Sequence, residues 1–377
     1  MPQFTLYCEE KNGVYTCSSQ PLQVDQNESD RSKKIPLQLS KEQQKKIEEE
    51  MLDISHNPEK YFQFPTENFN FIYEKGNNIV LADFEYPTSQ EQNNALNGFF
   101  ASSNKNIQNI SKLSLYLRFG HVPSSICKLK HLQELEVATD FDDQKYQIAL
   151  PECLKNTQLE HLGIHTWNYD QNDDETKSAK IQVSFPSIPT LTSFSSEFPL
   201  AFKELNRLHQ KEPMKKLKHI SIHFPYNNLA PDYELDSLLP QLNEYSIINP
   251  IPELIAPNIS KMRSPKSVTI HVTGINYTNY GEEFNKIDFS KIPQFNFYYD
   301  TQFAKADSIF KGFNPAKFND IMTNPNNNIA LTSGYNNSGN TGSIGEQCQQ
   351  IFQHSQYLFK KNQDFEKSFA EYMKKCL

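Results

Sequence analysis

Apolar residues recur through the middle of the chain in one pattern, apolar-x-x-apolar-x-apolar, which first appears at Ile110. The middle positions of its eight copies are Leu113, Leu135, Leu162, Phe194, Ile220, Tyr245, Val268 and Phe295, so successive copies lie 22, 27, 32, 26, 25, 23 and 27 residues apart. Each copy predicts a short strand with alternate residues turned inward, followed by a segment that returns the chain to the next strand. A stack of such units buries a continuous core that one unit alone cannot form.

The residues between the inward positions should point outward and form rows across the strands. Three positions after each middle residue stand Tyr116, Ala138, His165, Glu197, His223, Ile248, His271 and Tyr298. One position after it stand Ser114, Glu136, Gly163, Ser195, Ser221, Ser246, Thr269 and Asn296, and one position before it stand Lys112, Glu134, His161, Ser193, His219, Glu244, Ser267 and Gln294. The pattern predicts a furrow of small hydroxyl residues flanked by His, Tyr and Glu. Such a surface suits partner recognition, although any solvated sheet face also carries polar residues at alternate positions.

At two junctions the pattern resembles a known family. Residues Val122–Val137 and Leu150–Ile164 are similar to the intracellular "IPxxIxxLxxLxxLxL" type of leucine-rich repeat. The resemblance extends from about Phe69 to Asp300 and implies an α/β solenoid with a curved parallel sheet. It further implies noncatalytic binding of a protein partner through the concave face of the array. The other interpretation is an ordinary α/β domain in which the leucine spacing arose by chance.

The sequence departs from this family at the position three residues after the last strand leucine, where an Asn or Cys usually bonds the turns together. The residues found there are Arg118, Asp140, Trp167, Pro199, Pro225, Pro250, Thr273 and Asp300. The turns must therefore be closed by other groups, and the array should be irregular.

The chain divides by composition into four segments. Residues 1–60 predict an appendage with a hairpin, Phe4–Cys8 and Val14–Cys17, and a helix from Ser40 to about Ile54. Residues 61–300 predict the repeat array, and a second hairpin, Phe69–Tyr73 with Ile79–Phe84, covers its first edge. Residues 301–345 predict an Asn/Gly-rich connector, and residues 346–377 predict a C-terminal helix that caps the array or docks a partner.

The candidate partner-binding residues are outward strand positions and the single tryptophan. They are Tyr116, His161, His165, Trp167, Glu197, His219, His223, His271 and Tyr298. Trp167, just before the acidic segment Asp170–Glu175, could be an anchor of an interface or a core residue at a turn. An enzymatic alternative takes His165, Glu197 and His223 as acid/base groups. No nucleophile, Gly-rich phosphate loop or GxSxG motif accompanies them, so we expect no catalytic residue and no cofactor. His165 and His223 stand two repeats apart, about 10 Å at ~4.8 Å per strand, which is too far to share one zinc ion, so we expect no metal.

Charge and composition narrow the class of partner. With 37 basic and 45 acidic residues the net charge is −8, which argues against binding to nucleic acid or to an anionic membrane. No apolar run is long enough to span a bilayer, and no basic segment followed by an apolar run marks a secretory signal. We therefore expect a cytoplasmic protein, unless a specialised route exports it. The six cysteines form no CxxC pair, which disfavours a zinc site. Cys8 and Cys17 could face each other on the first hairpin, or remain two unpaired thiols.

Several roles share a binding surface of this kind. The protein could be a scaffold or adaptor, a subunit of a larger assembly, or a bacterial-type effector. It could also be the substrate receptor of a ubiquitin ligase, but residues 1–60 show no F-box-like helical cluster. The oligomeric state is not set by the sequence.

Overall fold

The computed structural model describes the chain in separate stretches. These are residues 4–11, 14–21, 45, 49, 53, 69–74, 78–84, 89–101, 103, 105–117, 121–139, 147–166, 181–223, 233, 235–272, 280–300, 314, 317, 321 and 324–332. The chain folds as two compact units. The first comprises residues 1–169 and 181–191, and the second comprises residues 170–180 and 192–377.

The first unit begins with two hairpins that share one sheet. The first hairpin is β1 (Phe4–Lys11) with β2 (Val14–Pro21), and the second is β3 (Phe69–Glu74) with β4 (Asn78–Phe84). Strand β1 pairs with β3 in antiparallel fashion, so the first hairpin continues the sheet of the second. Both predicted hairpins are confirmed, and the backbone register places Cys8 opposite Cys17.

Parallel strands follow in the same unit. Strand β4 pairs with β5 (Lys112–Leu117), which confirms that the second hairpin covers the first edge of the array. Strands β6 (Glu134–Thr139) and β8 (His161–Thr166) continue the sheet in parallel. The intervening elements are α3 (Ser89–Ala101), α4 (Lys105–Gln108) and the 3₁₀ turns η1 (Ser124–Lys128) and η2 (Glu152–Asn156), together with a small separate sheet of β7 (Gln147–Ala149) and β9 (Gln182–Ser184).

A disulfide joins two successive turns of the first unit. Cys127 in η1 is bonded to Cys153 in η2, with their Cα atoms 6.0 Å apart. The two cysteines stand 26 residues apart in sequence, about one repeat. The sequence analysis did not predict this bond.

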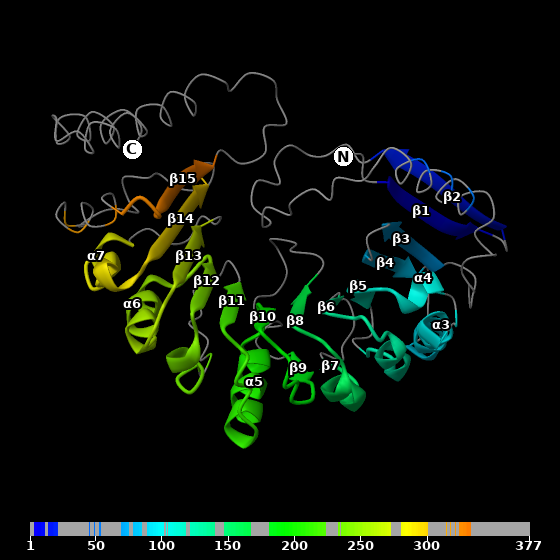
Figure 1. Ribbon diagram of the computed structural model, residues 1–377, viewed down its shortest axis with the longest axis horizontal. Helices are drawn as coiled ribbons and strands as arrows, with labels where there is room; N and C mark the ends of the chain where they lie inside the picture. The colour runs from blue at the N-terminus through cyan, green and yellow to red at the C-terminus, as the bar shows by residue number, and fades with distance from the viewer. Residues whose placement is uncertain are drawn as a thin grey trace. The chain divides into compact units, whose positions relative to one another are not determined.

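The described part of the second unit contains six parallel strands in chain order. They are β10 (Ser193–Ser196), β11 (His219–His223), β12 (Glu244–Ile248), β13 (Ser267–Val272), β14 (Gln294–Asp300) and β15 (Asn328–Thr332). The connections contain α5 (Pro199–Lys211), α6 (Pro252–Lys261), α7 (Gly281–Phe284) and the 3₁₀ turns η4 (Leu239–Gln241) and η5 (Phe289–Lys291). In Figure 1 these helices all lie on one side of the strands of the unit.

The predicted pattern fixes the core in both units. Leu113, Leu135 and Leu162 stand side by side on neighbouring strands of the first unit. In the second unit the corresponding row is Phe194, Ile220, Tyr245, Val268 and Phe295. Each of these eight side chains is at most 1% exposed. The chain is therefore an α/β protein with a large parallel sheet, consistent with a solenoid-like fold, and all eight predicted strands are confirmed.

Helix α5 shows how the returning segments complete the core. Pro199 begins the helix, where its missing N–H costs no hydrogen bond. Its apolar face carries Phe202, whose ring meets that of Phe194 on β10 edge to face, with centroids 5.2 Å apart. Phe202 also meets Tyr233 at 5.4 Å. Burial of this aromatic face holds the helix against the sheet.

Tyrosine hydroxyl groups bond to backbone carbonyl groups at turns of the second unit. The Tyr280 hydroxyl donates to the carbonyl oxygen of Pro250 at 2.9 Å, and the Tyr233 hydroxyl donates to that of Glu197 at 3.4 Å. Both tyrosines are buried. Asn249 adopts a positive φ of 51°, which Asn tolerates better than most residues. These contacts are consistent with the expectation that groups other than an Asn ladder hold the turns.

The end of the predicted array lies further along the chain than expected. We predicted that the pattern stops at Asp300 and that the Asn-rich residues beyond form a connector. Instead, Asn328–Thr332 form β15, which pairs with β14. Asn327, just before β15, fixes the start of this strand against β14. Its side-chain oxygen accepts from the backbone N–H of Phe295 at 2.7 Å, and its amide donates to the carbonyl of Ile321 at 2.8 Å. A loop interpretation is therefore wrong for this segment.

Other expectations lie partly or wholly outside the described residues. In the helix predicted from Ser40 the structure describes Lys45, Glu49 and Asp53, and all three are helical. The predicted C-terminal helix of residues 346–377 is not among the described residues, and neither is Trp167. Within the described part of the chain, no helix is long and apolar enough to cross a bilayer.

Candidate functional site

The outward face of the second unit carries three polar rows in strict register. The hydroxyl row consists of Ser195, Ser221, Ser246, Thr269 and Asn296 on β10–β14. The imidazole row consists of His223, Ile248, His271 and Tyr298 on β11–β14. The entry row consists of Ser193, His219, Glu244, Ser267 and Gln294. Neighbouring positions of a row are spaced by about 4.8 Å, the distance between paired strands.

Hydrogen bonds fix one end of the hydroxyl row. The Asn296 amide nitrogen donates to Thr269 Oγ1 at 3.1 Å and to Ser267 Oγ at 3.5 Å. Its amide oxygen accepts from Gln294 Nε2 at 3.3 Å. Asn296 is 7% exposed, so its donors and acceptor are satisfied within the sheet face rather than by bulk water. The surface is therefore organised before any partner arrives, which lowers the entropy cost of binding.

The entry row begins with a similar contact. Ser193 Oγ and His219 Nδ1 lie 3.2 Å apart on neighbouring strands. His219 is half-buried, and Glu244 beside it on β12 is exposed. This edge of the face thus presents an imidazole and a carboxylate in neighbouring positions.

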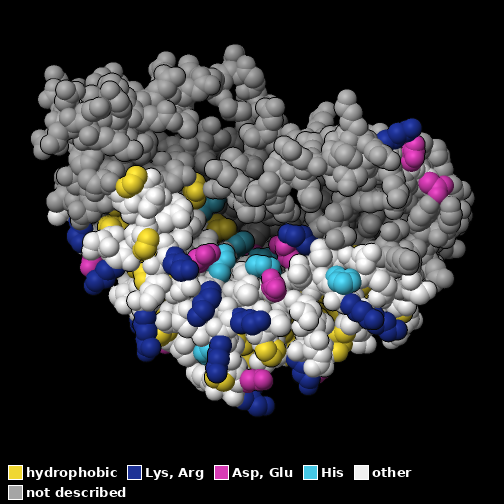
Figure 2. Space-filling model, viewed as in Figure 1, with side chains coloured by type: hydrophobic (Ala, Val, Ile, Leu, Met, Phe, Trp, Pro, Cys, Tyr) yellow, Lys and Arg dark blue, Asp and Glu magenta, His cyan; other side chains and the backbone are white. Residues whose placement is uncertain are grey.

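Neighbouring rings of the imidazole row support each other. His271 and Tyr298 stand side by side on β13 and β14, and their rings meet edge to face with centroids 5.8 Å apart. His223, His271 and Tyr298 are all half-buried, so each keeps part of its surface available. Figure 2 shows histidine side chains reaching the surface of the described strands. Such partly exposed, mutually supported rings suit the anchors of an interface.

Burial and charge together set the protonation of His223. Loss of hydration in the folded chain, reinforced by the neighbouring positive charge of His271, lowers the pKa of His223 to about 4. The imidazole is consequently neutral at neutral pH. It offers a ring N–H donor and a ring nitrogen acceptor rather than a positive charge.

Acidification should destabilise the second unit through His223. Its folded pKa of about 4 lies below the ordinary value of 6.5, so between these values the unfolded chain binds a proton that the folded chain excludes. Stability is fully present above pH 6.5 and falls as the pH drops toward 4. The loss due to this residue should be about 1 to 3 kcal/mol, given 1.36 kcal/mol per pKa unit. Urea denaturation at pH 7 and pH 4.5, with a chelator present, measures it.

The matched variant His223→Gln removes the titrating group and keeps a polar side chain. It should lose less stability than the wild type between the two pH values. Equal losses in the two proteins would contradict the assignment to His223.

Glu197 directly follows the last residue of β10 and lies beside the first residue of the imidazole row. Ser196 stands opposite Ile222, so the next residue along each strand brings Glu197 beside His223. A Glu197 carboxylate oxygen and a His223 ring nitrogen lie within 4.8 Å of each other. Glu197 is only 2% exposed, which is unusual for a carboxylate. The sequence placed Glu197 in this row but gave no sign of its burial.

The first unit carries the remaining candidates on corresponding rows. Tyr116, Ala138 and His165 align across β5, β6 and β8, and Lys112, Glu134 and His161 align one residue before the core row. Tyr116 is 8% exposed, His165 is half-buried and His161 is exposed. Lys112 and Glu134 form an ion pair across β5 and β6. Trp167 lies outside the described residues, so its role stays a prediction.

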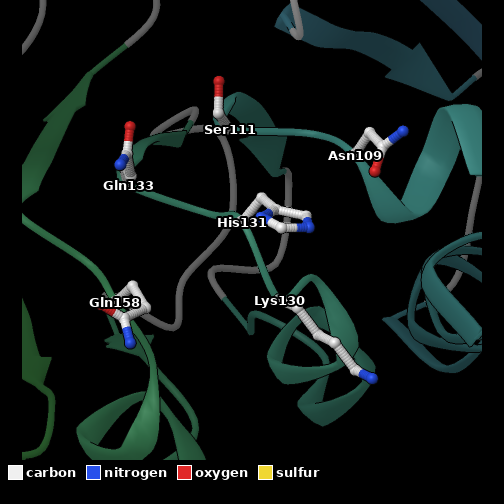
Figure 3. A pocket seen from close by; sticks show the side chains of 6 residues that line it. All are labelled: Asn109, Ser111, Lys130, His131, Gln133 and Gln158. Carbon is white, nitrogen blue, oxygen red and sulfur yellow. The ribbon is translucent and has the colours of Figure 1, made fainter.

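An open depression of about 700 Å³ lies elsewhere on the first unit. It is lined by Asn109, Ser111, Lys130, His131, Gln133 and Gln158. Figure 3 shows these side chains on the segments that lead into β5, β6 and β8. No acidic side chain is among them. The sequence analysis missed this feature, although polar residues on both sides of the first apolar position of each repeat were a signal.

The fold and the rows define an α/β protein with a patterned outer sheet face. Neither the comparison with protein-family models nor that with curated proteins finds a match. Among solved structures, the chain is similar to a Bacteroides fragilis protein at 10% identity and a TM-score of 0.42, over 89% of this chain and 92% of that one. It is also similar to a chain of a TLR13–ssRNA13 complex at 14% identity and a TM-score of 0.31, over 63% of this chain and 35% of that one. At these scores neither likeness carries an argument about function.

Proposed function

We propose that the protein is a leucine-rich repeat solenoid that binds another protein, without catalysis, through the outward sheet face of its second unit. The observation that carries the proposal is the unbroken register of the hydroxyl and imidazole rows across neighbouring strands. A protein partner that lies across these strands meets small hydrogen-bonding groups in one row and larger rings in the next. That combination supplies adaptable polar contacts beside rigid anchors.

The chemistry of the rows favours a partner without strong charge. The hydroxyl row contains Ser, Thr and Asn, and the imidazole row contains two histidines, Ile248 and Tyr298. His223 is neutral at neutral pH because its pKa is lowered to about 4. Neutral donors and acceptors recognise backbone amides and polar side chains, whereas a phosphate backbone is recognised chiefly by Lys and Arg. The proposal therefore names a protein as the partner and excludes nucleic acid.

The test compares the partners captured by two triple variants of the full chain. One variant, H223A/H271A/Y298A, removes three rings of the imidazole row. The matched control, K203A/Q210A/K211A, removes three exposed side chains of α5. Immobilised wild-type protein is exposed to native extract, captured proteins are identified by mass spectrometry, and the affinity of each purified partner is then measured.

We expect the row variant to weaken binding of a captured partner at least tenfold and the control to leave it unchanged. Removal of interface anchors commonly costs about 2 kcal/mol or more, which is sufficient for this effect. Because the three row side chains are half-exposed, the variant should keep the wild-type circular dichroism spectrum. The proposal fails if every partner binds the row variant as tightly as it binds the wild type.

A further inference from the structure

A buried acidic side chain lies beside an imidazole where β10 ends. Glu197 is 2% exposed, and one of its carboxylate oxygens lies within 4.8 Å of a ring nitrogen of His223. A carboxylate oxygen and an imidazole nitrogen are both common ligands of transition-metal ions. Their close approach here is the observation that suggests a metal site.

The backbone around Glu197 is held from both sides. The buried Tyr233 hydroxyl donates to the Glu197 carbonyl oxygen at 3.4 Å. One residue earlier, Ser196 Oγ accepts from the backbone N–H of Phe198 at 3.1 Å and fixes the turn into α5. The carboxylate therefore projects from a rigid segment, as side chains that bind a ligand require.

His223 is held equally firmly by the sheet. It is the last residue of β11, and it pairs with Ile248 on β12. One residue earlier in each segment, Ile222 of β11 and Ser196 of β10 stand in register. His223 thus originates from backbone that the parallel sheet fixes, and Glu197 directly follows the last residue of the neighbouring strand, which lies about 4.8 Å away.

We propose that Glu197 and His223 bind a divalent transition-metal ion of the Zn²⁺ class. Zn²⁺ binds imidazole nitrogen and carboxylate oxygen at about 2.0–2.2 Å in tetrahedral geometry, which places the two donor atoms about 3.3 Å apart. The observed separation, at most 4.8 Å, reaches this value by small rotations of the two side chains. An imidazole ligand favours Zn²⁺, Cu²⁺ or Ni²⁺ over Mg²⁺ and Ca²⁺, which prefer oxygen ligands. Water, or donor atoms of a bound ligand, completes the coordination.

His223 also belongs to the imidazole row of the proposed partner surface. Metal binding is therefore measured on the free protein, with no partner present, so that its failure can be told apart from a failure of partner binding. Chelator-treated full-length protein is titrated with Zn²⁺ by isothermal calorimetry. H223A and E197Q should each weaken binding at least tenfold, equivalent to about 1.4 kcal/mol. H271A is the matched control, because His271 lies on the same row two strands away from His223, and its affinity should stay within twofold of wild type.

Two outcomes would overturn the metal site. One is unchanged affinity in both H223A and E197Q. The other is an equal loss in H271A, which would indicate loose binding to any surface histidine. Folding of each variant is checked by circular dichroism without metal.

A measurement on the wild type keeps the test decisive if a variant does not fold. Co²⁺ replaces Zn²⁺ in such sites and is paramagnetic, so it should broaden the imidazole proton resonances of His223 far more strongly than those of His209 on α5. Equal broadening of the two histidines, or none, would contradict the assignment.

Discussion

Replacement of Phe284 by alanine should lower the unfolding free energy of the second unit by about 3 to 5 kcal/mol. Phe284 is the last residue of α7 and is 1% exposed. Among the described residues its ring has aromatic neighbours with centroids 5.4 to 6.5 Å away. Phe289, Phe295 and Phe297 meet it edge to face, and Tyr280 is tilted against it. Removal of the ring would lose its own burial and would leave a cavity against rings that belong to other elements.

The neighbours explain why this position should be more costly than an average core site. Phe295 and Phe297 belong to β14, Phe289 begins η5, and Tyr280 precedes α7 and closes the turn at Pro250. A cavity at Phe284 therefore loosens the contacts of a strand, a 3₁₀ turn and a turn-closing tyrosine together.

Urea denaturation monitored by circular dichroism measures the effect. Phe284→Leu is the matched control, because it retains most of the apolar volume and should lose roughly half as much stability or less. A loss below about 1 kcal/mol for Phe284→Ala would show that the site collapses around the cavity and that the aromatic cluster does not depend on this ring.

Reduction of the Cys127–Cys153 disulfide should destabilise the first unit by about 2 to 4 kcal/mol. The bond closes a loop between cysteines 26 residues apart and so restricts the unfolded chain. It also holds η1 beside η2, two turns that come from successive repeats. The entropy of the unfolded chain supplies most of the effect, because the two half-buried cysteines add little apolar surface to the core.

The experiment uses a matched pair of proteins with and without reductant. Wild-type protein should unfold at a lower urea concentration after treatment with a phosphine reductant. The double variant C127S/C153S should already be less stable and should not respond further to reduction. If reductant lowers the stability of the double variant by as much as that of the wild type, the effect comes from other cysteines.

This measurement also bears on the expected location of the protein. The sequence led us to expect a cytoplasmic protein, and disulfides persist chiefly in oxidising compartments. A bond that glutathione reduces readily is compatible with the cytosol, whereas one that resists glutathione indicates function outside it.

The inward pattern made most of the sheet predictable. Leu135 and Leu162 look alike in sequence and stand side by side in the structure, and the same logic placed Tyr245 in the core despite its hydroxyl group. That group finds a partner in Asn258, whose amide donates to it at 2.8 Å. Period-two alternation specifies which residues face inward, and one shifted residue would expose all of them, so the register follows from hydrophobic burial alone.

Features that depend on distant residues were not predictable in this way. Tyr233 and Tyr280 close turns about 30 to 36 residues earlier in the chain, and no local pattern connects a tyrosine to its acceptor carbonyl. Strand β15 was not recognised, because the Asn-rich residues around it are typical of a loop. Glu197 lies in the short turn between β10 and α5, and its burial depends on the path of that turn. The alternation of inward and outward strand residues does not predict this path.

The candidate disulfide had a usable signal that the search for CxxC spacing overlooked. Cys127 follows Ile126 and Cys153 precedes Leu154 at corresponding turns of the two best repeats. Because successive repeats stack, two cysteines about one repeat apart and in the same turn lie close together. The relevant spacing in such an array is the repeat length, not a short motif.

The strict register of the second unit has a consequence for how such a protein can change over evolutionary time. Strands β11, β12 and β13 each contribute one residue to every row and contact chiefly the strands beside them. Gain or loss of one whole repeat, by unequal recombination within a gene, would lengthen or shorten each row by one residue and leave the others aligned. Insertion of a partial repeat would break every row at once. Lineages of this protein should therefore differ by whole repeats, and the length of the face they offer should vary in steps of one strand.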